Sequence, residues 1–318
     1  MTLSVVPFPV DIPAALRFAE EALRSRLAPG EELPTLLPPI AAAIRSARAG
    51  GGLLRADRES AGIVTWESAG PIGTAVRLLY LSPAAANADR YREALSLAER
   101  SAGPVAFAPG PLAGLSRTEE SSLMRSLGFA PYGRSEMALP PTAMVAAAPA
   151  PRGAQVRPVG PSDEPRLAHL HERAYRDHLD RFLALEDIDP TRDAERQVRD
   201  YFSGRYGELL TPGSSLVSLD GETVAAVLST QRAGQALIID VMSDPAHQGE
   251  GYGRAALSDA LAALRERGEN VIVLNVTEGN DRAIRLYQRL GFVRTMGPTQ
   301  EWYDARRIRV AFPRAPPP

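Results

Sequence analysis

The 318-residue sequence predicts an α/β protein in which two copies of one fold follow each other along the chain. Short apolar runs typical of buried strands alternate with amphipathic helical patterns. The two halves also repeat each other. Leu-Met-Arg-Ser-Leu-Gly-Phe at 123–129 matches Leu-Tyr-Gln-Arg-Leu-Gly-Phe at 286–292, and a strand closed by Pro83 matches one closed by Pro245. The interval from proline to phenylalanine is nearly the same in both halves, which indicates a duplicated unit.

A Pro/Ala-rich stretch at 147–153 lies near the middle of the chain and is typical of a linker. We therefore predict a first domain over 1–145, a linker over 146–154 and a second domain over 155–318. The chain is long enough for each domain to bury its own core.

The composition is that of an ordinary globular protein, with 44% hydrophobic residues, 23% charged residues and a net charge of −2. Without a basic excess, nucleic acid is not an expected partner. No apolar run is long enough to cross a membrane, and the N-terminal residues lack the pattern of a signal peptide, so a cytoplasmic protein is expected. A homo-oligomer is compatible with this composition.

The sequence contains no cysteine and four histidines, which excludes disulfides and thiolate ligands. His169, His171 and His178 lie on one predicted helix, where we expect solvated or packed side chains and no metal site.

The most informative segment is Gln-Gly-Glu-Gly-Tyr-Gly-Arg at 248–254, between an apolar strand at 236–241 and an amphipathic helix that stops at Gly268. Glycines at the start of a helix let the backbone approach a ligand closely, so that free amides and the helix dipole can face an anion. The segment lacks the lysine of a P-loop and the third glycine of a dinucleotide fingerprint. It therefore predicts a phosphate-binding loop of another kind.

The loop resembles the acyl-CoA pyrophosphate loop of the GNAT family of N-acetyltransferases, Arg/Gln-x-x-Gly-x-Gly/Ala, with Gln248, Gly251 and Gly253 at the defined positions. A strand at 270–276 follows, and then Asn280, Ala283, Tyr287 and Gly291-Phe292 at the family's spacing. The resemblance covers residues 155–312. It implies two tandem GNAT folds, each with a mixed central sheet flanked by helices. It also implies an enzyme that moves an acetyl group from acetyl-CoA, its cosubstrate, to a primary amine of a small molecule or peptide.

The resemblance also implies a set of donor-binding residues. Backbone amides of the loop would hold the pyrophosphate, Arg254 would add a charge-assisted contact, and the preceding strand would offer its backbone to the pantetheine arm. Asn280 either contacts the donor or caps its helix. The predicted set is Val241, Ser243, Gln248, Gly249, Glu250, Gly251, Tyr252, Gly253, Arg254 and Asn280.

Two catalytic residues are predicted, Tyr287 and Asp240. The family counterpart of Tyr287 protonates the leaving thiolate, although a tyrosine at this helical position would also suit a core. Asp240 is a candidate base, because a charged residue in an apolar strand needs either a partner or a function. Glu172, His171, Glu301 and an ordered water are weaker alternatives for the base. A non-catalytic acyl-CoA-binding module is the alternative to an enzyme.

The first copy lacks this chemistry. In register with the repeat, Ala86, Asp89 and Tyr91 stand opposite Gln248, Gly251 and Gly253, and Met124 stands opposite Tyr287. A carboxylate and bulky side chains at the loop positions would prevent a pyrophosphate from approaching. We therefore predict that the first domain is a non-catalytic scaffold.

The other elements of the second half are predicted from local signals. Strands at 155–159, 214–219 and 223–230, with Asp220-Gly221 as a hairpin turn, precede the loop. Helices are predicted over 163–179, capped by Ser162, and from Thr191 to Tyr206. Strands at 300–303 and 307–312 are predicted to close the sheet.

Overall fold

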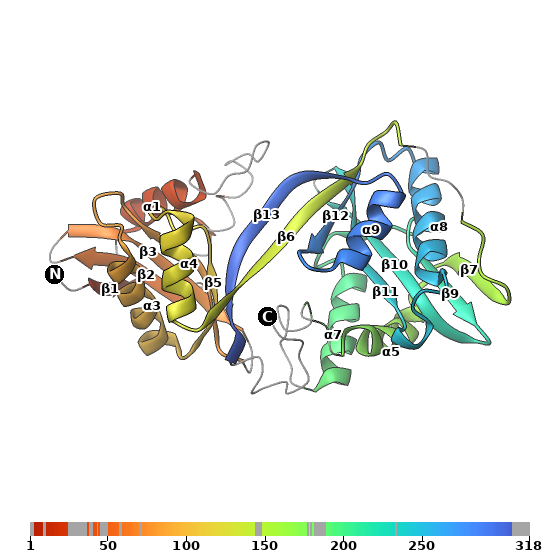
Figure 1. Cartoon of the computed structure of the whole chain (residues 1–318), viewed down its shortest axis with the longest axis horizontal. Helices are drawn as coiled ribbons and strands as arrows, with labels where there is room; N and C mark the ends of the chain where they lie inside the picture. The colour runs from red at the N-terminus through yellow and green to blue at the C-terminus, as the bar shows by residue number, and fades with distance from the viewer. Residues whose placement is uncertain are drawn as a thin grey trace. The chain divides into compact units, whose positions relative to one another are not determined.

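The structure is a computed structural model. It describes residues 3–8, 11–24, 37, 41–42, 44, 50–56, 59–69, 72–143, 148–176, 178, 180, 189–232 and 234–306, with the side chains of 296–300 left aside. The chain separates into two compact units (Figure 1). The first unit consists of Met1–Gly133 and Thr299–Pro318, and the second of Arg134–Pro298.

The first unit is a six-stranded sheet in the order β1-β2-β3-β4-β5-β13. Helix α1 packs on one face through an apolar cluster with Leu53 and Ile63, and α3 and α4 pack on the other. Its elements are β1 (Leu3–Pro7), α1 (Ile12–Arg24), β2 (Gly50–Ala56), β3 (Glu59–Ser68), β4 (Thr74–Leu81), α3 (Ala88–Ala102), β5 (Val105–Pro109), α4 (Arg117–Ser126) and the end of β13 (Val293–Asp304).

The second unit is a sheet in the order β7-β9-β10-β11-β12-β6, with β8 on the side of β10. Helices α5 and α7 cover one face, and α8 and α9 cover the other (Figure 1). Its elements are the end of β6 (Phe129–Leu139), β7 (Ala154–Pro158), η2 (Pro161–Asp163), α5 (Glu164–Tyr175), α7 (Pro190–Phe202), β8 (Glu208–Leu209), β9 (Ser215–Leu219), β10 (Glu222–Arg232), β11 (Gln235–Ser243), η3 (Pro245–His247), α8 (Tyr252–Glu266), β12 (Ile272–Thr277), α9 (Asp281–Arg289) and the start of β13.

The two sheets have the same pattern of strand directions. In each, three antiparallel pairings are followed by one parallel pairing, β4 with β5 in the first unit and β11 with β12 in the second. The prediction of two tandem copies, each with a mixed sheet flanked by helices, is confirmed.

The last strand of each sheet comes from the other half of the sequence. Residues 134–139 of β6 follow the first copy but pair with β12, and Met137 and Leu139 are buried in the core of the second unit. Residues 301–303 of β13 pair with β5, and Trp302 is buried in the first unit, where its Nε1 donates to Glu120 Oε1 at 2.7 Å. The units therefore divide the chain differently from the predicted 1–145 and 155–318, because these pairings join residues that are distant in sequence.

Local signals located the elements of the second unit well, with differences at the helix starts. Asp220 and Gly221, both with positive φ, form the predicted hairpin turn between β9 and β10. The α7 cap is Asp189, whose side chain accepts from the amide of Thr191, so the prediction of Thr191 as the cap was wrong. Ser162 lies inside η2, and Asp163 precedes α5 instead. The predicted strand at 307–312 lies outside the described residues.

None of the described helices has the length and apolar character that a membrane span requires.

In the first unit, a side chain fills the space beside the parallel strand pair. The pairing of β4 with β5 ends at Ala75, and the fully buried Tyr91 of α3 lies beyond it. Its hydroxyl donates to Ala113 O at 2.8 Å and accepts from the amide of Leu81, at the end of β4, at 3.4 Å. Met124 is fully buried in the same core. Tyr91 thus occupies a place where the backbone edge of β4 would otherwise need another partner.

We predict that residues 155–318 expressed alone will be poorly soluble. This fragment lacks residues 134–139 of β6, so one edge of β12 is unpaired and the apolar contacts of Met137 and Leu139 are lost. Size-exclusion chromatography with light scattering should show aggregates.

The matched control is a fragment of residues 129–298, which restores β6 and omits the segment that pairs with β5. It should be recovered in soluble, monomeric form at a higher yield. A stable, monomeric 155–318 fragment would show that the exchanged strand is dispensable.

Candidate active site

The site is built where the two parallel strands of the second unit separate. β11 pairs with β12 only over Ala236–Ile238. The β10–β11 register shifts just beyond, because Ser229 is opposite Ile238 and Leu228 is opposite Asp240, which leaves Ile239 as an extra residue. Such a bulge bends the strand. From Ile239 to Ser243, the β12 side of β11 therefore has no strand partner among the described residues.

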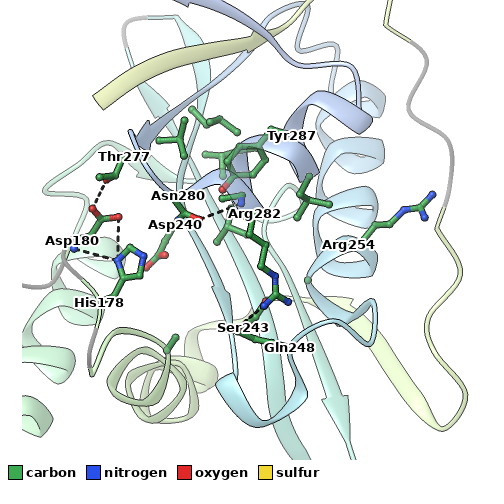
Figure 2. A pocket seen from close by; sticks show the side chains of 18 of the residues that line it. His178, Asp180, Asp240, Ser243, Gln248, Arg254, Thr277, Asn280, Arg282 and Tyr287 are labelled. Carbon is green, nitrogen blue, oxygen red and sulfur yellow. Dashed lines mark hydrogen bonds and ion pairs between the residues drawn. The ribbon is translucent and has the colours of Figure 1, made fainter. Parts of the chain in front are cut away.

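A cavity of about 560 Å³ occupies this separation. It is lined by both strands, by the glycine loop and by α9. All of the predicted catalytic and donor-binding residues line it except Glu250, which is exposed. The structure thus brings together residues that were predicted from separate motifs (Figure 2).

The glycine loop presents backbone to the cavity. Gly249 and Gly251 have φ of 95° and 97°, a conformation that other residues adopt only with strain. Gly251 is the N-cap of α8 and supplies no side-chain hydrogen bond to the first turn. At Gly253, a Cβ would lie 2.6 Å from Ser243 Oγ, so only glycine fits against β11 without displacing that hydroxyl. The loop therefore combines close approach with amides that have no side-chain cap, as an anion site requires.

A cation that the motif did not identify lies beside the loop. Arg282 of α9 donates from Nη1 to Gln248 Oε1, whereas the Arg254 guanidinium points away from the other labelled side chains (Figure 2). Both arginines line the cavity. Arg282 was missed because its position relative to Gln248 depends on how α9 packs on the sheet.

Tyr252 belongs to the core as much as to the loop. Its side chain is buried in the cluster beneath α8, and its ring lies 6.0 Å from that of His247. The loop is thereby anchored at the first residue of the helix, while its glycines remain at the cavity surface.

Tyr287 lies on α9 with its ring 5.9 Å from Phe292 and only 7% of its surface exposed. Its hydroxyl points into the cavity (Figure 2) and has no hydrogen-bond partner within the described residues. Burial raises the pKa of Tyr287, and the charges of Asp240 and Asp180 raise it further. The phenol is therefore protonated at neutral pH and available as a donor. The ring also packs in the core, as the alternative interpretation expected, and the role of Tyr287 as a proton donor stays a prediction.

Asn280 is the N-cap of α9. Its side-chain oxygen accepts from the amide of Ala283 at 3.2 Å, while the residue also lines the cavity. The helix-capping alternative is thus present in the structure, and donor contact by Asn280 stays a prediction.

Asp240 is buried, with hydroxyl donors on both carboxylate oxygens. Tyr175 donates to Oδ1 at 2.6 Å, Tyr201 donates to Oδ2 at 3.1 Å, and His171 Nε2 lies 3.8 Å from Oδ2. The pKa of Asp240 is raised, because burial together with the charge of Asp180 outweighs the lowering by His171 and the two hydroxyls. Among the described residues, no arginine pairs with Asp240.

The sequence motifs include neither Asp180 nor Thr277, and His178 was expected to be a solvated or packed side chain. All three line the cavity near Tyr287 (Figure 2). Of the weaker base candidates, Glu172 pairs with Arg176, and Glu301 belongs to the first unit. Within the described residues, no group of three or more His, Asp or Glu side chains is placed to hold a metal.

Comparison with known proteins agrees with this geometry. Residues 169–292 match the Acetyltransferase (GNAT) family. The chain is similar to the mycothiol acetyltransferase of Thermobispora bispora, with 33% identity over 50% of this chain and 52% of that protein. It is also similar to the mycothiol acetyltransferase of Thermomonospora curvata, with 29% identity over 63% of each chain. The matches span about half to two thirds of the length of these relatives.

Solved structures show the same fold over nearly the whole chain. A GCN5-related N-acetyltransferase from Sphaerobacter thermophilus superposes with a TM-score of 0.61 at 20% identity, covering 94% of each chain. A tandem GNAT protein from the clavulanic acid biosynthesis pathway gives 0.53 at 14% identity, covering 94% of this chain and 97% of that one. The resemblance to tandem GNAT proteins is therefore confirmed at the level of fold.

We predict that Gly251→Asp abolishes binding of acetyl-CoA while the protein remains folded. The variant places the residue of the first copy at the mouth of α8, where its carboxylate would repel a phosphate and the positive φ would be strained by roughly 1–2 kcal/mol. Calorimetry should show an affinity loss on the order of 100-fold or more.

Gly268→Asp is the matched control. Gly268 follows α8 with φ of 88°, and a Cβ added there would meet no atom within 4 Å, so the same backbone strain arises away from the cavity. The two variants should lose similar thermal stability, but only Gly251→Asp should lose acetyl-CoA. Equal affinities for acetyl-CoA would show that the loop does not hold the donor.

Proposed function

On the premise that this chain carries a GNAT acetyltransferase domain, we propose that its second unit transfers the acetyl group of acetyl-CoA to a primary amine of a small molecule or peptide. The observation that carries the proposal is the cavity between β11 and β12, because it joins an anion-binding loop to a buried, protonated phenol. The named relatives, which are mycothiol acetyltransferases, support acyl transfer as the reaction class.

The donor fits the cavity at the loop end. Amides of Gly249 to Arg254 and the dipole of α8 face an anion there, and the guanidinium of Arg282 adds a positive charge. The unpaired edge of β11 from Val241 to Ser243 offers backbone donors and acceptors to an extended arm that contains amides. The phosphates of acetyl-CoA can come close to the backbone here because Gly249, Gly251 and Gly253 have no side chains.

Acetyl-CoA supplies the acyl group as a thioester, and the chain's own residues supply the proton transfers. The Tyr287 hydroxyl donates a proton to the sulfur that departs, since it is protonated and points into the cavity. Tight packing of its ring in the core fixes the position of this hydroxyl. Positioning of this kind contributes to catalysis because the phenol does not have to be ordered during the reaction.

Asp240 is our candidate for the group that accepts the amine proton, directly or through a water. A raised pKa favours proton acceptance, and the Tyr175 and Tyr201 hydroxyls hold the carboxylate in one orientation. Each carboxylate oxygen accepts one of these hydrogen bonds and keeps a second lone pair that can take the proton.

The alternative function is binding of acyl-CoA without catalysis. The two differ in one measurable respect, which is whether free CoA appears when acetyl-CoA and an amine are supplied together. A screen of primary amines monitored by thiol release decides between them, and tight acetyl-CoA binding with no thiol release would favour the binding module.

We predict that Tyr287→Phe keeps the affinity for acetyl-CoA and lowers turnover by roughly 10²-fold or more, the usual scale for one acid–base group. The substitution removes the hydroxyl and keeps the ring that packs on Phe292. Steady-state rates with any amine found in the screen provide the measurement.

Tyr287→Ala is the companion variant, because it also removes the packing and should cost about 3–5 kcal/mol of stability. If the side chain served only the core, phenylalanine would behave as the parent and alanine alone would be impaired. A phenylalanine variant within about twofold of the parent rate removes Tyr287 from the mechanism.

A further inference from the structure

At the end of the cavity away from the glycine loop lies a carboxylate that the mechanism above does not use. Asp180 lines the cavity with 26% of its side chain exposed. Its Oδ1 accepts a hydrogen bond from Thr277 Oγ1 at the end of β12, which fixes the carboxyl group against the sheet (Figure 2). Thr277 is itself only 4% exposed, so this anchor is part of the buried structure.

The other oxygen, Oδ2, is available to a ligand. The neighbouring His178 Nδ1 lies 3.6 Å away, too far for a hydrogen bond, and it already accepts from the amide of Asp180 at 3.2 Å. Because Nδ1 accepts this hydrogen bond, it does not donate one to the Asp180 carboxylate. Among the described residues, no donor lies within hydrogen-bond distance of Oδ2.

An independent feature points to a ligand in the same space. The Tyr287 side chain is more than nine-tenths buried, and its hydroxyl points into the cavity without a protein partner among the described residues. Asp240 is the second carboxylate in the cavity lining, and Arg134 and Arg289 line the cavity in addition to Arg254 and Arg282. The effects of the two carboxylates on the pKa of Tyr287 both exceed that of Arg134. The charged groups around this hydroxyl thus favour a cation.

We propose that the acceptor of this enzyme is a cationic amine, and that Asp180 binds its ammonium group through Oδ2 at the end of the cavity opposite the phosphate loop. The inference rests on the proposed function and defines the acceptor class more narrowly. Asp180 acts as the binding group that brings the nitrogen beside Tyr287, and Thr277 and His178 hold Asp180 in place. Uncharged amines would bind this end more weakly.

Two CoA thioethers test the proposal without knowledge of the natural acceptor. S-(2-aminoethyl)-CoA carries an ammonium close to where the acceptor nitrogen would lie, and S-propyl-CoA has a methyl group in its place. Calorimetry should show that the parent protein binds the aminoethyl compound about tenfold more tightly, as expected for a partly buried ion pair. In Asp180→Asn this preference should disappear, while the affinity for S-propyl-CoA stays within about twofold of the parent.

Glu266→Gln is the control for the loss of one negative charge, because Glu266 lies exposed at the end of α8 outside the cavity. It should keep the tenfold preference. Equal binding of the two thioethers by the parent protein, or an unchanged preference in Asp180→Asn, overturns the role of Asp180 while donor binding stands. If neither thioether binds the parent protein, donor binding itself fails, and the inference fails with it.

Discussion

In each unit, two parallel strands separate after a short pairing and leave a strand edge that needs a partner. Once β11 and β12 diverge beyond Ile238, the edge of β11 has backbone groups that require a partner. The two copies meet this requirement in different ways. In the first unit, Tyr91 fills the equivalent place and binds the amide of Leu81. In the second, the helix begins with glycines instead, and the space stays open as the cavity.

The two ends of the cavity differ in charge because different elements form them. One end contains the start of α8 and Arg282, which favour anions. The other contains Asp180 and the buried Asp240, and Tyr287 lies near both carboxylates. A substrate pair with phosphates at one end and an ammonium at the other matches this arrangement, and the reacting atoms would then meet beside the phenol.

Features encoded by short segments could be predicted from the sequence, whereas features that depend on distant contacts could not. The glycine loop, the Asp220-Gly221 turn and the position of Tyr287 each follow from a few neighbouring residues. The contact of Thr277 with Asp180 joins residues 97 positions apart, and no local pattern encodes it. The exchanged strands were missed for the same reason, because Trp302 and Glu120 meet only in the folded chain. The α7 cap shows a limit even for local signals, since Asp189 and Thr191 are both good capping residues.

We propose that the second copy of the duplicated fold binds acetyl-CoA and that Tyr91 closes the equivalent place in the first. Calorimetric titration of the full-length protein with acetyl-CoA tests this most directly, because it counts sites as well as measuring affinity. We expect a single class of site with one acetyl-CoA bound per chain. Two equivalent sites per chain, or the absence of any binding, would contradict it.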